Sequence, residues 1–69
     1  MPYEKYALLR DKRGLTDYAV SKATDIAPST LSDWKNGVSA PKVDKLVKIA
    51  RLFGMSLDEL LGDGPEEGR

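Results

Sequence analysis

Apolar residues recur along most of this chain at intervals of three or four, which is the period of an amphipathic helix. No stretch alternates strictly between apolar and polar residues, as a half-buried strand would. The pattern divides the chain into four or five short segments. They cover residues 3–13, 16–25 and 28–36, then a fourth segment that starts at 41 or 42 and runs to 53, and residues 57–61. The sequence therefore predicts an all-α chain without strands.

Helix-start and helix-stop residues support these boundaries. Thr16 can cap the first turn of the second segment, and Pro28 suits the first position of the third. Ser56 and Glu59 have the spacing of a capping box at the start of the last segment. Pro41 either belongs to the loop before the fourth segment or opens that helix. A glycine follows three of the segments, at Gly14, Gly37 and Gly54.

The candidate core consists of apolar side chains that share a face within each segment. The second segment contributes Ala19, Val20 and Ala23 as its buried stripe, and the third contributes Leu31 and Trp34. The three tyrosines are expected in the core or at its boundary. The other core candidates are Tyr6, Leu9, Val43, Leu46, Val47, Ile49, Ala50 and Phe53.

Composition limits how the fold can be stabilised. The 69 residues have room for one domain, and they include no Cys and no His. Disulfides and the common kinds of zinc site are therefore excluded, and helix packing must hold the fold. We expect no metal, cofactor or small-molecule ligand. The start of the sequence lacks a signal peptide, and no apolar run approaches the roughly 20 residues that span a bilayer, so we expect a cytoplasmic protein without a membrane segment.

The charge balance gives little direct support for nucleic-acid binding. Eleven basic residues equal eleven acidic ones, whereas DNA-binding domains are usually basic. The charges are unevenly distributed, however. Residues 1–57 carry ten basic and six acidic residues, a net charge of +4, and residues 58–69 carry −4. The body of the chain is mildly basic and its last residues are acidic.

Residues 15–37 contain the most informative pattern. Two helices of about two turns are joined by only about four residues, 24–27, and small residues lie on the first helix. So short a link forces the helices to cross at about 90–120°, as in a helix-turn-helix. In that geometry the second helix protrudes and can enter a DNA major groove, which is about 12 Å wide.

The third segment has two chemically different faces. Leu31 and Trp34 point inward, while Ser29, Asp33 and Asn36 follow the spacing of an outward face. The outward side chains are short and rich in hydrogen-bonding groups, so they would let the helix backbone come close to base edges. Pro28, Thr30 and Ser32 flank this face.

These residues, in this order, resemble the phage-repressor and Cro-like (XRE) helix-turn-helix family. The resemblance lies in Leu15-Thr16, Ile26, Ser29-Thr30-Leu31-Ser32, Trp34-Lys35-Asn36-Gly37, and residues 53–61. It covers about residues 3–62 and implies a compact five-helix lambda-repressor-like domain, with the helix-turn-helix in helices 2 and 3. We therefore expect a helix-turn-helix DNA-binding domain at residues 1–62 and a disordered acidic tail at residues 63–69.

The resemblance also implies a function and a set of site residues. The family binds double-stranded operator DNA, usually as a homodimer, and regulates transcription, most often as a repressor. By position, the residues that would approach bases are Pro28, Ser29, Thr30, Ser32 and Asp33. Those that would meet phosphates are Thr16, Asp17, Lys35, Asn36 and Lys42. Candidate dimer contacts are Met55, Leu57, Leu60 and Leu61.

The chain departs from the family pattern at five positions, one of which is Ser21, where a small Ala is usual. Asp25 stands where a turn glycine is usual, and Ala27 replaces a helix-capping Ser or Thr. Asp17 replaces a common Gln, and Asp33 adds a negative charge to the outward face of the third segment. These acidic residues and the neutral net charge leave a second hypothesis open, a protein-binding adaptor or antitoxin-type module on the same fold with weak DNA binding. We expect no enzymatic activity, because the chain lacks His and Cys, has no glycine-rich phosphate loop, and carries only scattered carboxylates.

Overall fold

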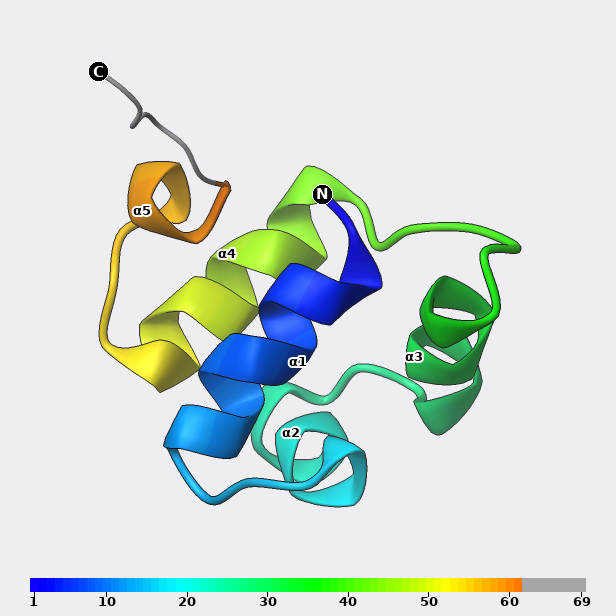
Figure 1. Cartoon of the computed structure of the whole chain (residues 1–69), viewed down its shortest axis with the longest axis horizontal. Helices are drawn as coiled ribbons and strands as arrows, with labels where there is room; N and C mark the ends of the chain where they lie inside the picture. The colour runs from blue at the N-terminus through cyan, green and yellow to red at the C-terminus, as the bar shows by residue number, and fades with distance from the viewer. Residues whose placement is uncertain (62–69) are drawn as a thin grey trace.

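A computed structural model describes residues 1–61, and the expected acidic tail at residues 63–69 lies outside the described residues. The described part folds into five helices without a strand, as the apolar pattern predicts (Figure 1). They are α1 (Tyr3–Lys12), α2 (Asp17–Thr24), α3 (Pro28–Lys35), α4 (Val43–Phe53) and α5 (Leu57–Leu61). No helix within residues 1–61 has the length and apolar character needed to cross a bilayer.

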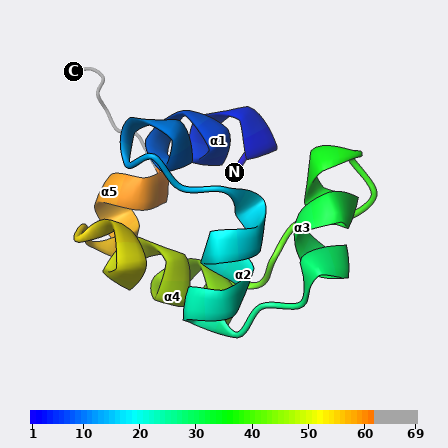
Figure 2. The ribbon, with the colours of Figure 1, turned by 90° about the horizontal axis from the view of Figure 1, so that it is seen from below.

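The helices pack in a way that leaves α3 at one end of the molecule. α4 packs against α2 and α5, α2 packs against α3, and α1 also contacts α3. Figure 2 shows α1 and α4 on opposite sides, with α2 and α5 between them. In both views α3 lies at the end opposite α5, so much of its surface faces outward (Figures 1 and 2).

Every one of the five helices contributes a buried apolar residue to the core. The buried set is Tyr6, Val20, Ile26, Leu31, Trp34, Leu46, Ile49, Ala50, Phe53 and Leu60. The centroid of the Tyr6 ring lies 4.9 Å from that of Trp34 and 6.0 Å from that of Phe53. Tyr6 therefore joins α1 to both α3 and α4.

The predicted buried stripe of α2 was partly wrong. Val20 is fully buried, but Ala19 is half-buried and Ala23 is exposed, whereas Ser21 and Thr24 are buried. Both hydroxyls have acceptors inside the fold, since Ser21 Oγ donates to Ile26 O at 2.6 Å and Thr24 Oγ1 donates to Val20 O at 2.7 Å. A hydroxyl that is satisfied locally loses little on burial, so these residues can take core positions.

Three further expectations about burial also need correction. Tyr18 is 68% exposed and Val43 is 61% exposed, so neither belongs to the core. Leu60 of α5, expected as a dimer contact, is fully buried, and Leu61 next to it is the exposed residue. In an α-helix, a shift of one position turns a side chain by about 100°, which is enough to move it from the buried face to the exposed surface.

The predicted helix ends are confirmed by their hydrogen bonds. Thr16 Oγ1 accepts from the Ala19 amide at 3.0 Å. Ser56 and Glu59 form the reciprocal capping box, with the Ser56 amide 2.8 Å from Glu59 Oε1 and the Glu59 amide 3.1 Å from Ser56 Oγ. Pro41 lies in the loop, because Lys42 is the residue that precedes the first turn of α4.

Candidate nucleic-acid interface

The turn between α2 and α3 fixes one end of the helix pair. Asp25 takes a left-handed conformation with φ of 61°, which Asp tolerates better than most residues because its side chain is short and polar. Ile26 follows and is buried. Its carbonyl oxygen accepts the hydrogen bond from Ser21 Oγ, so the turn is tied back onto α2.

α3 presents the outward face that its sequence predicts. Leu31 and Trp34 are buried, which orients the helix. Pro28, Ser29, Ser32 and Asp33 are exposed, and Thr30 is half-buried. The five base-facing candidates therefore all lie on α3, around a face that no other described helix covers.

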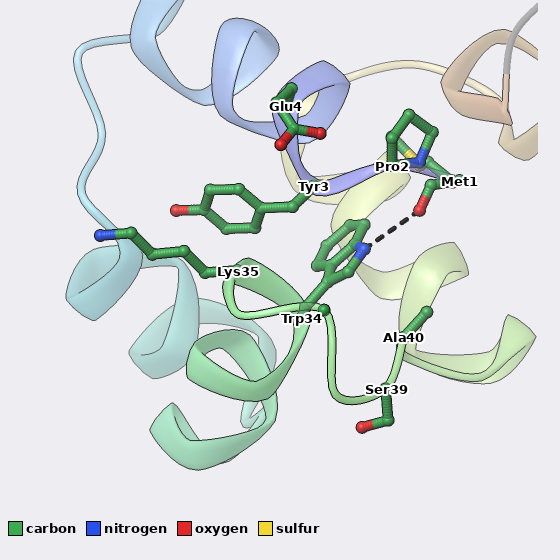
Figure 3. Close-up of a pocket in the computed structure, with 9 residues that line it drawn as sticks. Met1, Pro2, Tyr3, Glu4, Trp34, Lys35, Ser39 and Ala40 are labelled. Carbon is green, nitrogen blue, oxygen red and sulfur yellow. Dashed lines mark hydrogen bonds between the residues drawn. The ribbon is translucent and has the colours of Figure 1, made fainter.

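Trp34 anchors this helix from its inner side. Its Nε1 donates a hydrogen bond to the carbonyl oxygen of Met1 at 3.0 Å (Figure 3). The indole meets the Tyr3 ring edge-on, with ring centroids 5.8 Å apart. In Figure 3 the indole points toward the start of α1, while the Lys35 side chain extends past the hydroxyl side of Tyr3. Trp34 is thus a core residue, as expected.

The phosphate candidates fall into two groups. Thr16, Asp17 and Lys35 line one open depression between α1, the start of α2 and the end of α3. Asn36 and Lys42 are exposed on the segment between α3 and α4, where Asn36 ends α3 and Lys42 precedes α4. Lys35 and Asn36 thus lie at the end of α3, and Lys42 lies six residues beyond Asn36 at the start of α4.

Asp17 is the centre of a hydrogen-bond network that sequence analysis missed. The Tyr3 hydroxyl donates to its Oδ2 at 2.7 Å, and the Tyr6 hydroxyl donates to its Oδ1 at 2.8 Å. Arg10 Nη1 donates to the same Oδ1 at 2.7 Å and to the Tyr3 hydroxyl oxygen at 2.9 Å. Tyr3, Tyr6 and Arg10 are spaced by three and four residues on one face of α1, which is the signal that could have grouped them.

These contacts stabilise the ionised form of Asp17 and pair its charge within the chain. Burial acts to raise the pKa of Asp17, but the hydrogen bonds from Arg10, Tyr3 and Tyr6 and the charge of Arg10 outweigh it and lower that pKa. Burial raises the pKa of Tyr6, and its hydrogen bond to Asp17 adds to this effect. At neutral pH, Asp17 is therefore an ionised carboxylate whose charge is paired within the chain. These three partners occupy its side chain, and the residue types alone did not predict them.

Arg10 is equally committed to acidic partners. Besides Asp17, it donates from Nη2 to Asp11 Oδ1 at 2.7 Å, and hydrogen bonds to Asp11 and Asp17 raise the pKa of Arg10. The cations among the phosphate candidates are Lys35, at the end of α3, and Lys42, before α4, and both are exposed. Within residues 1–61, no group of His, Cys, Asp or Glu could hold a metal ion.

Comparison with known proteins places this geometry in context. The model of the family described as Helix-turn-helix matches residues 7–60. Among solved structures, the chain is similar to a transcriptional regulator from Listeria innocua, with a TM-score of 0.74 and 25% sequence identity. The similarity covers 97% of this chain and 63% of that one, so this chain spans less than two thirds of the length of the regulator. No curated protein matches the sequence.

Proposed function

Since this chain belongs to the phage-repressor and Cro-like (XRE-type) helix-turn-helix family, we propose that it is a sequence-specific DNA-binding regulator of transcription, and that it acts as a repressor. The observation that carries this proposal is the division of α3 into two faces. The side chains of Leu31 and Trp34 are buried in the core. The opposite face of α3 exposes short polar side chains at the end of the molecule. A helix displayed in this way can enter a major groove.

The side chains on α3 suggest how bases would be read. Ser29 and Ser32 can each donate and accept a hydrogen bond, so they can meet either kind of group on a base edge. Asp33 can accept from N4 of cytosine. Pro28 and Thr30 would lie beside them and provide apolar contact, for which the thymine methyl group is the natural partner.

Phosphate contacts would position the helix on both sides of the groove. On one side, Thr16 and Lys35 share the depression at the start of α2. The first amides of a helix lack partners within the helix and carry its positive end, so the backbone at Asp17, and not its carboxylate, suits a phosphate there. On the other side, Asn36 and Lys42 are available from the segment after α3.

A single domain of this kind contacts few base pairs, so we propose that it binds as a homodimer. Two copies of α3 would occupy successive major grooves about 34 Å apart and block access to a promoter. The surface of α5 offers a contact, because Leu61 is exposed and Met55 and Leu57 are half-buried.

The alternative is a protein-binding module on the same fold, such as an antitoxin-type domain. Asp33 favours it, because this carboxylate is exposed on the outward face of α3 and would repel phosphates. The net charge of zero points the same way. In this case α3 would recognise donor groups on a protein instead of base edges.

Selection from a pool of random duplex DNA tests the proposal. Several rounds at low salt should enrich a symmetric motif, and the affinity for that motif should fall steeply as salt is added. The spacing between half-sites would then give the geometry of the dimer. An absence of enrichment at tens of micromolar protein, where even non-specific binding is normally seen, would refute DNA binding and favour the protein-binding module.

A further inference from the structure

Tyr3 and Tyr6 each contact both helices of the helix-turn-helix. Their rings meet Trp34 of α3, with centroids 5.8 Å and 4.9 Å away. Their hydroxyls donate to the two carboxylate oxygens of Asp17 in α2, at 2.7 Å and 2.8 Å. Each of the two tyrosines therefore contacts α3 with its ring and α2 with its hydroxyl.

The positions of these contacts along the two helices matter. The turn joins the end of α2, at Thr24, to the start of α3, at Pro28. Asp17 is the first residue of α2, and Trp34 is the last but one of α3, so both lie at the ends farthest from the turn. The two helices are therefore joined by the chain at one end and bridged by α1 at the other. In Figure 2 the start of α1 lies beside the end of α3 that is farthest from the turn.

The bridge that Tyr3 and Tyr6 form restrains the orientation of α3 relative to α2 as well as the distance between the two helices. Tyr6 is fully buried between Trp34 and Phe53, so its ring has little room to turn. Arg10 Nη1 contacts both Asp17 Oδ1 and the Tyr3 hydroxyl oxygen, which closes the network on itself. Hydrogen bonds to an ionised acceptor are among the stronger ones in proteins, and four partners in one network restrain each other.

We propose that Tyr3 and Tyr6 are positioning residues for DNA reading, which set the angle between α2 and α3 by bridging Asp17 and Trp34. This inference rests on the proposed function. The start of α2 would be held against the phosphate backbone, while α3 carries the residues that meet base edges. A change in the angle between the two helices would then displace the side chains on α3 from the bases, although the phosphate contacts could still form.

The consequence is a specific loss of discrimination. Hydrogen bonds to base edges weaken steeply when their geometry is poor, whereas attraction to phosphates depends mainly on charge. Removing the two hydroxyls changes no charge on the protein surface at neutral pH. Binding to the preferred DNA site should therefore weaken more than binding to unrelated DNA.

The test compares Tyr3→Phe, Tyr6→Phe and the double variant with Ile49→Val. The Phe variants keep the aromatic rings on Trp34 and remove only the hydroxyls. Ile49 is fully buried in α4 and has no part in the bridge, so Ile49→Val lowers stability without altering the contacts to Asp17. Each variant is titrated with the selected DNA site and with an unrelated duplex of the same length, at a temperature where all the variants are folded.

We expect the double variant to lose roughly three- to tenfold in the ratio of the two affinities, which corresponds to about 0.6–1.4 kcal/mol and so to part of the energy of one hydrogen bond to a charged group. The single variants should fall between it and the unaltered protein, and Ile49→Val should keep the original ratio. A shift in the emission of Trp34, which is the only tryptophan in the chain, should accompany the Phe variants and not Ile49→Val.

An unchanged ratio in the double variant, with all proteins folded, would overturn the inference. A parallel loss for both DNA sites would do the same, because it would mean a general loss of folded protein or of phosphate contacts. If the unaltered chain selects no DNA motif, the proposed function fails first. The emission of Trp34 then shows separately whether the hydroxyls still set the position of α3.

Discussion

Arg13 donates two hydrogen bonds to the carbonyl oxygen of Phe53, from Nε at 3.2 Å and from Nη2 at 2.9 Å. Its guanidinium carbon also lies 4.7 Å from the centroid of the Phe53 ring. Phe53 is the last residue of α4, where backbone carbonyls have no partner within the helix. Arg13 therefore caps α4 from the end of α1, which brings a cation to the negative end of the helix dipole.

Replacing this arginine should destabilise the fold without altering the proposed DNA-binding face. We expect Arg13→Ala to lower the free energy of unfolding by about 1–2 kcal/mol, because the carbonyl bond and the contact with the ring are both lost. Thermal unfolding followed by circular dichroism should record a midpoint lower by about 5–10 °C. Lys48→Ala, which removes a positive charge from the exposed surface of α4, is the control and should change little. Equal losses in the two variants would argue against the cap.

The missing cap of α3 offers a way to stabilise the protein. Ala27 precedes the helix in an extended conformation and forms no side-chain hydrogen bond with its first turn. Ala27→Ser should supply the acceptor and raise the free energy of unfolding by about 1 kcal/mol, as measured by urea denaturation. Ala27→Val adds volume without an oxygen and should give no such gain. A serine variant no more stable than the valine variant would contradict this account.

The hydrogen-bond network around Asp17 should make the free energy of unfolding depend on pH in the acidic range. The folded state lowers the pKa of this carboxyl, so its contribution is fully present above the unfolded value of about 3.9 and is lost as pH falls through the folded value. We expect Asp17→Asn to be less stable than the unaltered protein at pH 7, and we expect the difference to shrink below about pH 4. Urea unfolding at pH 7 and at pH 2.5 measures both values. A difference that stays constant with pH would show that the charge of Asp17 is not what stabilises the fold.

The salt dependence of DNA binding should distinguish phosphate contacts from base contacts. Lys42→Gln should weaken binding to all DNA sequences to a similar extent and reduce the slope of log affinity against log salt by about 1. Ser29→Ala should leave that slope unchanged and alter the preferred motif instead. The measurement is a salt titration on the selected site and on one unrelated duplex. A slope unaffected by Lys42→Gln would remove this residue from the phosphate contacts.

Local signals in the sequence predicted the helices and their ends. Helix caps and turns form between residues that are close in the sequence, so they can be deduced from the residue types. Examples are Thr16, Asp25 and the pair Ser56 and Glu59. The family resemblance rested on an ordered set of such local features, and the family match confirms it. The predicted base-facing residues all lie on α3, but their contacts with DNA stay a prediction.

The contacts between helices could not be deduced in the same way. Asp17 appeared to be an exposed anion beside DNA, because its partners Tyr3 and Tyr6 are 14 and 11 residues away on another helix. Helical periodicity identifies the face of α1 that carries them, but it does not say which helix that face meets. Ser21 and Thr24 were missed for a related reason, since their burial depends on acceptors that only the folded turn provides.

The hydrogen bond from Trp34 to Met1 closes a loop of 33 residues, whereas the contacts of the turn lie within five. Opening of the first residues would therefore release α3 at the same time, although α3 is distant from them in the sequence. Native-state hydrogen exchange should then group the amides of α3 with those at the start of α1 in one cooperative unit. In this molecule, proximity along the chain is a poor guide to which helices come apart together.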